Sequence, residues 1–214
     1  MFDAIFFDND GILVETDHLF FRACSETLKK LVDFDLPYEL YREHILVQGV
    51  GFHEFLKTRG CDIEISELRR MRTERYFELL RNSEISVFPG VRETLSKLSK
   101  KIPLGVVTAA QKKEFEIIHE KLDLRKYFDF VVDRDDVEFS KPHPEGYLLA
   151  AKKAEVPPKK CLVIEDSPRG ISAAKNAGMM CWCVPTKNTR EMDLSQADKI
   201  FEKMPEILKE LEKN

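Results

Sequence analysis

The sequence predicts an α/β protein in which a parallel sheet is covered by helices on both faces, with a helical segment inserted after the first strand. Two observations support this prediction. Short apolar runs alternate with amphipathic helical patterns through the second half of the chain, as in parallel sheets with crossover helices. These runs are apolar without interruption, which is typical of strands buried on both faces.

The composition indicates a globular protein and excludes some classes of partner. The chain has 214 residues, of which 43% are hydrophobic and 34% charged, enough for a substantial core. The net charge of −4 argues against a nucleic-acid binder or a membrane-surface protein. Five scattered cysteines lack the spacing of a zinc site, so we interpret them as buried free thiols. With no signal peptide or spanning segment expected, we predict a cytoplasmic protein.

The first strand, at residues 2–7, ends abruptly at Asp8-Asn9-Asp10-Gly11. Two carboxylates at the end of a buried strand lose hydration and repel each other, so their charged forms need a compensating cation. Mg²⁺ is the simplest candidate, because it is a hard cation that takes oxygen ligands. Gly11 permits a sharp turn directly after the pair. For this tetrapeptide alone, a solvated turn is an equal alternative.

After the first strand the apolar spacing becomes helical. Helical patterns cover about residues 16–32, 37–58 with an interruption near Gly49 and Gly51, and 66–82. We find no convincing strand between residues 16 and 83. The sequence therefore predicts a core formed by residues 1–15 and 84–214 and a helical domain formed by residues 16–83.

The second half of the chain alternates strand and helix. Strands are predicted at 103–108, 128–132, 160–164 and 180–184, with a weaker one at 199–201, and helices at 91–100, 112–122, 144–154, 168–177 and the C-terminus. Ser167-Pro168 is a good helix start and Gly178 a good helix stop.

Polar residues occur where three of the predicted strands end. Asp8 and Asp10 follow the first strand, Thr108 ends the second, and Glu165-Asp166 ends another. Ligands of parallel α/β sheets bind outside the carboxyl ends of the strands, so we expect these side chains to converge. Asp8, Asp10 and Asp166 then form a Mg²⁺ site, with Glu165 as a nearby or water-mediated ligand.

Phosphate-binding groups accompany this cluster. Lys141, in a loop, is a compact charge suited to a phosphate oxygen, and Thr108 can donate a hydrogen bond to a second oxygen. The backbone amides of Ala109 and Ala110 stand at a helix entrance and can add further donors. Together these parts predict a phosphoryl-transfer site in which one aspartate is the nucleophile and another the general acid and base.

Four ordered motifs, Asp8-x-Asp10-Gly11, Thr108, Lys141-Pro142 and Glu165-Asp166, resemble those of the haloacid dehalogenase-like superfamily. The helical insertion resembles the cap of the branch that contains β-phosphoglucomutase and phosphoglycolate phosphatases. This resemblance implies a Rossmann-like three-layer core with an α-helical cap that selects the substrate. Because similar proteins with a helical cap are often monomers, it also implies a monomer. It implies that Asp8 is the nucleophile, Asp10 the general acid/base, and Thr108 and Lys141 phosphate ligands. It also implies that Mg²⁺ is held by Asp166, Asp8 and the Asp10 carbonyl.

The insertion favours a phosphatase of a small phosphorylated metabolite over a phosphosugar mutase, which stays the alternative. Phe20 stands where the mutases have a histidine, and the segment from Gln48 to Phe52 keeps their glycine but lacks their two charged residues. Arg72 or Arg75 could supply one charge, which is poor neutralisation for the second phosphate of a mutase intermediate. A dehalogenase is disfavoured because that chemistry needs neither Asp10 nor a metal site, and a non-enzymatic protein because all the catalytic groups are present.

The remaining aromatic and histidine residues have two possible roles each. We hypothesise that Phe20 and Phe52 face the substrate cleft, whereas Phe21 and Phe55 belong to the core of the helical domain. His119 lies in a predicted helix among charged residues, so we expect it at the surface.

Overall fold

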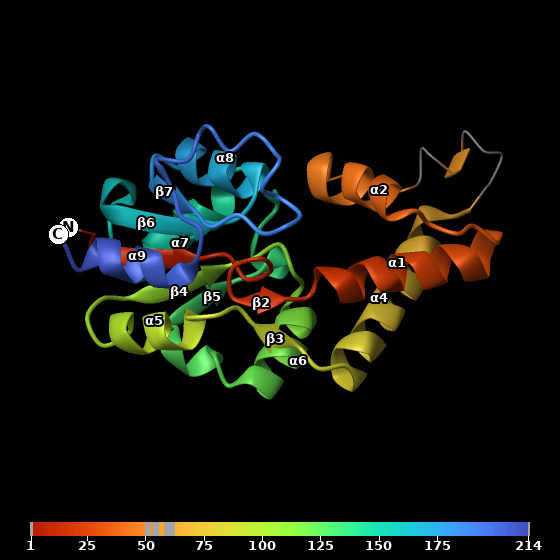
Figure 1. Cartoon of the computed structure of the whole chain (residues 1–214), viewed down its shortest axis with the longest axis horizontal. Helices are drawn as coiled ribbons and strands as arrows, with labels where there is room; N and C mark the ends of the chain where they lie inside the picture. Colours follow the sequence, from red (N-terminus) through yellow and green to blue (C-terminus); the bar gives the residue numbers. More distant parts are fainter. Residues whose placement is uncertain (1, 50–51, 53–55, 58–62, 214) are drawn as a thin grey trace. The chain divides into compact units, whose positions relative to one another are not determined.

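The structure of the protein, a computed structural model, describes residues 2–49, 52, 56–57 and 63–213. The chain divides into two compact units (Figure 1), Met1–Glu15 with Ile85–Asn214 and Thr16–Glu84. We call these the core unit and the cap unit. No helix in the described part of the chain is long and apolar enough to cross a membrane.

A six-stranded parallel sheet forms the centre of the core unit, in the order β5-β4-β1-β6-β7-β8. Its strands are β1 (Ala4–Phe7), β4 (Leu104–Val107), β5 (Phe130–Val132), β6 (Cys161–Glu165), β7 (Met180–Cys183) and β8 (Lys199–Ile200). All residues of β1 and β6 are buried, as the uninterrupted apolar runs predicted. The parallel α/β prediction is therefore confirmed, including the weak last strand.

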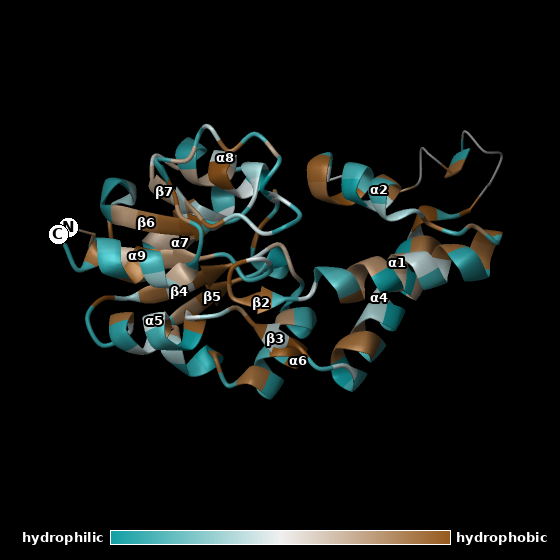
Figure 2. Ribbon diagram, in the orientation of Figure 1, coloured by the Kyte–Doolittle hydropathy of each residue, from teal (hydrophilic) through white to brown (hydrophobic). Residues whose placement is uncertain are grey.

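Helices cover both faces of this sheet. They are α5 (Val91–Leu98), α6 (Lys112–Leu122), α7 (Glu145–Ala154), α8 (Pro168–Asn176) and α9 (Met204–Leu211), with short 3₁₀ turns at Arg125–Tyr127, Arg134–Asp136 and Pro158–Lys160. Figure 1 shows α7 and α8 on one side of the sheet and α5 and α6 on the other. Figure 2 shows apolar strands between helices that carry both hydrophilic and hydrophobic residues. The three-layer prediction is confirmed. The Ser167 hydroxyl accepts a hydrogen bond from the Gly170 amide and caps α8 as expected.

Strand register brings the polar strand ends together. Phe7 is paired with Val106 on one side and with Ile164 on the other. The residues that follow in β1, β4 and β6 therefore lie side by side at the carboxyl edge of the sheet. The chain runs from β1 outward to β4 and β5, then returns to β6 on the other side of β1. This reversal of strand order marks the position where ligands bind in open α/β sheets.

A small antiparallel pair, β2 (Val14–Glu15) with β3 (Ser86–Val87), was not predicted. It joins the two chain segments at which the core unit is interrupted by the cap unit. Each strand has only two residues, which is too short for apolar alternation to be visible in the sequence.

The cap unit is helical throughout its described part, with α1 (Asp17–Val32), α2 (Tyr38–Tyr41), a π-helical turn (Arg42–Val47) and α4 (Ile65–Asn82). Helices α1 and α4 pack against each other. An aromatic cluster fills the interior, where Phe21 packs edge-on against Tyr38 and Tyr41. Phe55 lies outside the described residues, as does Cys61. The other four cysteines are buried free thiols, as predicted.

Candidate functional site

Lys141 is the charged centre of the carboxyl edge of the core sheet. Its Nζ donates to Asp8 Oδ1 at 2.8 Å, to Glu165 Oε1 at 2.7 Å and to the Val107 carbonyl at 2.9 Å. These acceptors come from the ends of three neighbouring strands, β1, β6 and β4. Burial acts to lower the pKa of this ammonium group, but the charges of Asp8 and Glu165 outweigh it and raise the pKa, so Lys141 stays protonated.

Glu165 is fully buried, and both of its carboxylate oxygens have donors. Besides Lys141, Oε1 accepts from the Tyr147 hydroxyl at 2.8 Å. Oε2 accepts from the Asp166 amide at 3.1 Å and from the Ser167 hydroxyl at 3.3 Å. This saturation favours a role in which Glu165 holds Lys141 in place rather than one in which it is a direct metal ligand.

The carboxyl groups of Asp8 and Asp166 both have raised pKa values, because nearby positive charge does not fully offset their burial and the negative charge around them. Burial, followed by the negative charge of Glu165, raises the pKa of Asp8 to about 7, although Lys141 acts to lower it. The same two causes raise the pKa of Asp166 well above its usual range. A bound cation would reverse both shifts, since an opposite charge at short distance favours the ionised carboxylate.

The oxygen atoms at this edge fit a hard divalent cation. One ligand atom from each of Asp8, Glu165 and Asp166 lies within 4.8 Å of the others. All three donors are carboxylate oxygens, the ligands that Mg²⁺ prefers over nitrogen or sulfur. With the oxygens of Glu165 already engaged, we assign the direct contacts to Asp8 and Asp166.

A tight turn presents Asp10 next to this cluster. The Asn9 carbonyl accepts from the amides of Leu13, at 2.8 Å, and Val14, at 3.1 Å. Gly11 has a φ of +87°, and a Cβ there would lie 2.4 Å from Asp166 Oδ2. Gly11 is therefore required twice, for the backbone conformation and for the close approach of a carboxylate.

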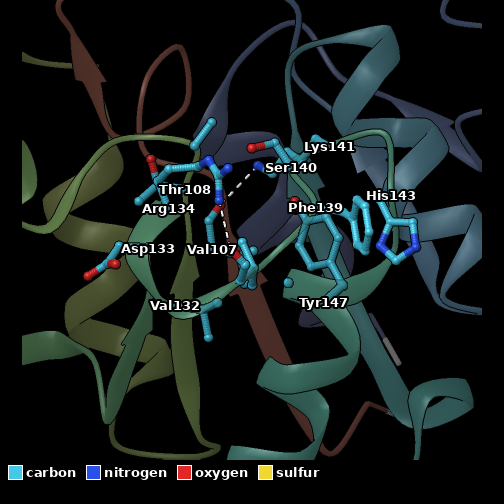
Figure 3. Close-up of a pocket in the computed structure, with 13 residues that line it drawn as sticks. Val107, Thr108, Val132, Asp133, Arg134, Phe139, Ser140, Lys141, His143 and Tyr147 are labelled. Atoms are coloured by element: carbon cyan, nitrogen blue, oxygen red, sulfur yellow. Dashed lines mark hydrogen bonds between the residues drawn. The ribbon is translucent and has the colours of Figure 1, made fainter.

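Thr108 follows β4 and is oriented by its own loop. Its Oγ1 accepts from the Ala110 amide at 3.0 Å, which leaves the hydroxyl proton to donate elsewhere. The Ala110 amide is therefore engaged, and of the two amides expected to bind phosphate only that of exposed Ala109 stays a candidate. Figure 3 shows Thr108 and Lys141 at one pocket, with Tyr147 beside them.

One histidine prediction was wrong. His119 is buried, with 4% of its surface exposed, and its Nε2 lies 2.8 Å from Asn9 Oδ1. Its charged sequence neighbours point to the exposed face of α6, whereas His119 shares the buried face with Phe115 and Leu122. His143 caps the loop before α7, because its half-exposed ring accepts a hydrogen bond from the Glu145 amide at the start of that helix.

The substrate residues predicted in the cap unit have different environments. Phe52 is buried in the aromatic cluster beside His44, and its role toward substrate stays a prediction. Phe20 is half-buried, with its ring 5.0 Å from that of Tyr76 and the Arg72 guanidinium 5.0 Å from its centroid. Exposed Gln48 donates to Glu43 at 2.6 Å.

The two cap arginines also differ. Arg75 is held by Glu26 and by Glu78. Arg72 forms no ion pair with a described residue, and its buried Nε has no hydrogen-bond partner among them. Arg72 lines a pocket of about 80 Å³ within the cap unit together with Cys24 and Phe52. Arg72 is therefore the available cation of the pair.

Sequence reasoning missed several residues that orient the site. Tyr147 holds Glu165, and Arg169 donates to the Lys141 carbonyl at 2.6 Å. Thr189, from the loop after β7, has its hydroxyl 3.5 Å from Asp166 Oδ2. A buried tyrosine was expected to need a hydrogen-bond partner, but nothing in the spacing says which residue supplies it.

Comparison with known proteins places this site in a family. The model of the haloacid dehalogenase-like hydrolases matches residues 2–178. A protein named phosphorylated carbohydrates phosphatase, from Thermotoga maritima, is 36% identical over 188 residues, covering 83% of this chain and 82% of the relative.

Two crystal structures of CbbY from Rhodobacter sphaeroides are also similar. The phosphate complex has a TM-score of 0.85 and 33% identity, and covers 95% of each chain. A complex with xylulose-(1,5)-bisphosphate has a TM-score of 0.82 and 32% identity, again over 95% of each chain. These matches, which extend over both units, confirm the resemblance drawn from the four motifs. The chain belongs to the haloacid dehalogenase-like hydrolase family.

Proposed function

We propose that the protein is a Mg²⁺-dependent phosphatase that hydrolyses a small phosphomonoester through an aspartyl-phosphate on Asp8. The observation that carries this proposal is the position of Lys141, which contacts Asp8 and Glu165 at the carboxyl edge of the sheet. An ammonium beside a carboxylate nucleophile offsets the repulsion between that carboxylate and an incoming phosphate dianion.

The chemistry has two steps. In the first, an Asp8 oxygen forms a bond to phosphorus while the bond to the leaving oxygen breaks, and Asp10 gives that oxygen its proton. In the second, Asp10, now a carboxylate, takes a proton from water as the water oxygen bonds to phosphorus and the Asp8–phosphorus bond breaks. Asp8 and Asp10 thereby return to their starting states.

The chain also supplies groups for the transferred phosphoryl oxygens. Lys141 contributes its charge, Thr108 a hydroxyl proton and Ala109 a backbone amide. When bound, Mg²⁺ would neutralise negative charge on the nucleophile and the phosphate, held by Asp8, Asp166 and the Asp10 carbonyl. The crystal structure of CbbY in complex with phosphate supports the proposal that this chain also binds phosphate.

The relatives favour a phosphorylated sugar or a similar small metabolite as substrate. The Thermotoga relative carries the name of a phosphorylated carbohydrates phosphatase, and CbbY was crystallised with a sugar bisphosphate. Arg72, the available cation of the pair Arg72 and Arg75, is our candidate for contact with a polar substrate group. The mutase alternative needs firm binding of a second phosphate, and Arg75 is already engaged by two carboxylates.

The test is release of inorganic phosphate from a panel of small phosphomonoesters, including glucose 1-phosphates, with Mg²⁺ and with EDTA. Asp8→Asn is the matched control, because it keeps the size of the side chain and removes the nucleophilic charge. We expect release that requires Mg²⁺ and is lost in this variant. Conversion of glucose 1-phosphate to glucose 6-phosphate with a bisphosphate primer, faster than release of phosphate, would instead establish a mutase.

A further inference from the structure

Asn9, between the two catalytic aspartates, connects Asp10 to a histidine on another element. Its side chain is fully buried, with Nδ2 at 3.1 Å from Asp10 Oδ2 and Oδ1 at 2.8 Å from His119 Nε2. His119 belongs to α6, 110 positions further along the chain. The contacts form a continuous hydrogen-bonded path from α6 to the carboxyl group of Asp10.

The chemistry of the three groups fixes the direction of these hydrogen bonds. A carboxylate only accepts, so the amide NH₂ of Asn9 is the group that donates to Asp10. The Asn9 carbonyl oxygen then faces His119, which must donate through a protonated Nε2. The path is therefore His119 to Asn9 to Asp10. It persists when Asp10 is protonated on its other oxygen, because Oδ2 still accepts.

The surroundings of His119 hold the ring in the required form. It stacks on Phe115 with ring centroids 3.8 Å apart and an interplanar angle of 19°. Its buried Nδ1 has no hydrogen-bond partner among the described residues, which fits an unprotonated nitrogen. Burial, and then the positive charge of Arg125, lower the pKa of His119 to about 4, so the ring is neutral near pH 7.

We propose that Asn9 and His119 are positioning residues that hold the Asp10 carboxyl group in the orientation from which it protonates the leaving oxygen. This proposal rests on the proposed function. The backbone of Asn9 is already fixed by the amides of the turn, so the amide side chain is the part that needs a further anchor. His119, on a packed helix, supplies that anchor by donating a hydrogen bond to the Asn9 side chain. Asn9 in turn donates a hydrogen bond to Asp10.

Loss of this anchor should affect the reaction selectively. Protonation matters for an alkoxide leaving group, which is a strong base, and matters little for p-nitrophenolate, which is a weak one. The value of kcat/KM reports steps up to aspartyl-phosphate formation, so it isolates the proton donation. A general loss of structure would lower kcat/KM for both kinds of ester equally.

The kinetic test compares kcat/KM for the best alkyl phosphate with that for p-nitrophenyl phosphate. Asn9→Leu keeps the shape of the side chain and removes both hydrogen bonds, and His119→Phe keeps the stack on Phe115 and removes the donor. We expect each to lower kcat/KM for the alkyl ester about tenfold or more, through kcat, and for p-nitrophenyl phosphate less than about threefold.

Two further variants control for structure. His119→Gln can place an amide donor near the position of Nε2, and we expect it to restore at least half of the alkyl phosphate activity. Ile118→Val removes a buried methylene from the same helix without touching the path, and we expect it to leave the ratio of the two substrates unchanged. Equal losses on both substrates in Asn9→Leu and His119→Phe would overturn the proposal.

A spectroscopic experiment tests the protonation state of the His119 ring without measuring turnover. In ¹⁵N-labelled full-length protein near pH 7, the His119 ring should be the neutral Nε2-protonated form, with its proton protected from exchange by Asn9. Asn9→Leu should remove that protection. An Nδ1-protonated ring would overturn the proposal even in an active enzyme. Failure of the wild-type protein to release phosphate would instead overturn the proposed function, and this proposal with it.

Discussion

The candidate catalytic edge of the core unit and the pocket of the cap unit differ in whether their charged side chains have hydrogen-bond partners. At the sheet edge, Lys141 has three acceptors and Glu165 has four donors, so the charged groups hold one another in place. In the cap pocket, the guanidinium of Arg72 packs on Phe20 and its Nε has no partner among the described residues.

We propose that this difference separates the chemical step from substrate selection. A site whose side chains are fully hydrogen-bonded is preorganised and does not rearrange when the transition state forms. A half-buried cation without a fixed partner can accept a partner from the substrate. Changes at the sheet edge should therefore lower kcat, whereas changes in the cap pocket should alter KM and the ranking of substrates.

The largest effect is expected at the centre of the sheet edge. Lys141→Met removes the cation between Asp8 and Glu165, and we expect turnover to fall more than about 100-fold. Because two buried carboxylates lose their partner, the free energy of unfolding should fall by about 3 kcal/mol. Phosphate release and urea unfolding measure the two effects. In Lys153→Met, which breaks an exposed pair with Asp136, unfolding should change by less than about 1 kcal/mol. Near-wild-type turnover in Lys141→Met would remove Lys141 from the mechanism.

A glycine pair tests how closely the site is packed. Gly11 and Gly178 both have positive φ, +87° and +73°, but only at Gly11 would a Cβ meet a neighbour, the Asp166 carboxylate. Both alanine variants should lose about 1 kcal/mol of stability from backbone strain. Only Gly11→Ala should also raise the Mg²⁺ concentration for half-maximal activity, by about tenfold or more. Equal metal dependence in the two variants would show that Asp166 can shift at no cost to activity.

The third prediction concerns pH and again uses the core. His119 has a pKa of about 4 in the folded protein, below the value of 6.5 expected when it is unfolded. Between these values the unfolded chain binds more protons than the folded protein. The contribution of neutral His119 to the free energy of unfolding is therefore present above pH 6.5 and is lost as pH falls towards 4. Relative to His119→Gln, the wild type should lose up to about 3 kcal/mol over this window. Parallel stability curves for the two proteins would contradict a buried neutral histidine.

The smallest effect is expected in the cap pocket. Arg72→Met keeps the length and packing of the side chain on Phe20 but removes the charge. We expect kcat to change less than about twofold, and KM to rise about tenfold for the esters whose leaving group is itself charged. Arg70→Met, which breaks an exposed pair with Glu74 on the same helix, is the control and should leave both constants unchanged. A large loss of kcat in Arg72→Met would erase the distinction between the two regions.

The sequence by itself determined the sheet and the polar residues gathered at its carboxyl edge, the candidate catalytic site. Uninterrupted apolar runs predict strands buried on both faces, and carboxyl ends of parallel strands meet at one edge, so Asp8, Thr108 and Glu165 had to converge. Lys141 was predicted near them as a phosphate ligand, because its compact charge suits a phosphate oxygen, whereas its contacts with Asp8 and Glu165 came from the structure. These inferences depend on short-range pattern and on charge balance, which are both visible in one chain.

Only the tertiary structure decided which neutral residues orient that edge and which aromatic residues are buried. His119 and Tyr147 sit in helices whose sequence pattern says which face is apolar, but not which polar atom that face will meet. The contacts of His119 with Asn9 and of Tyr147 with Glu165 span 110 and 18 positions of the chain. The burial of Phe52 could not be predicted for the same reason, because an aromatic ring suits a substrate cleft and a hydrophobic cluster equally well. A hydrogen bond or a packing contact forms between two surfaces, and a sequence pattern describes only one of them.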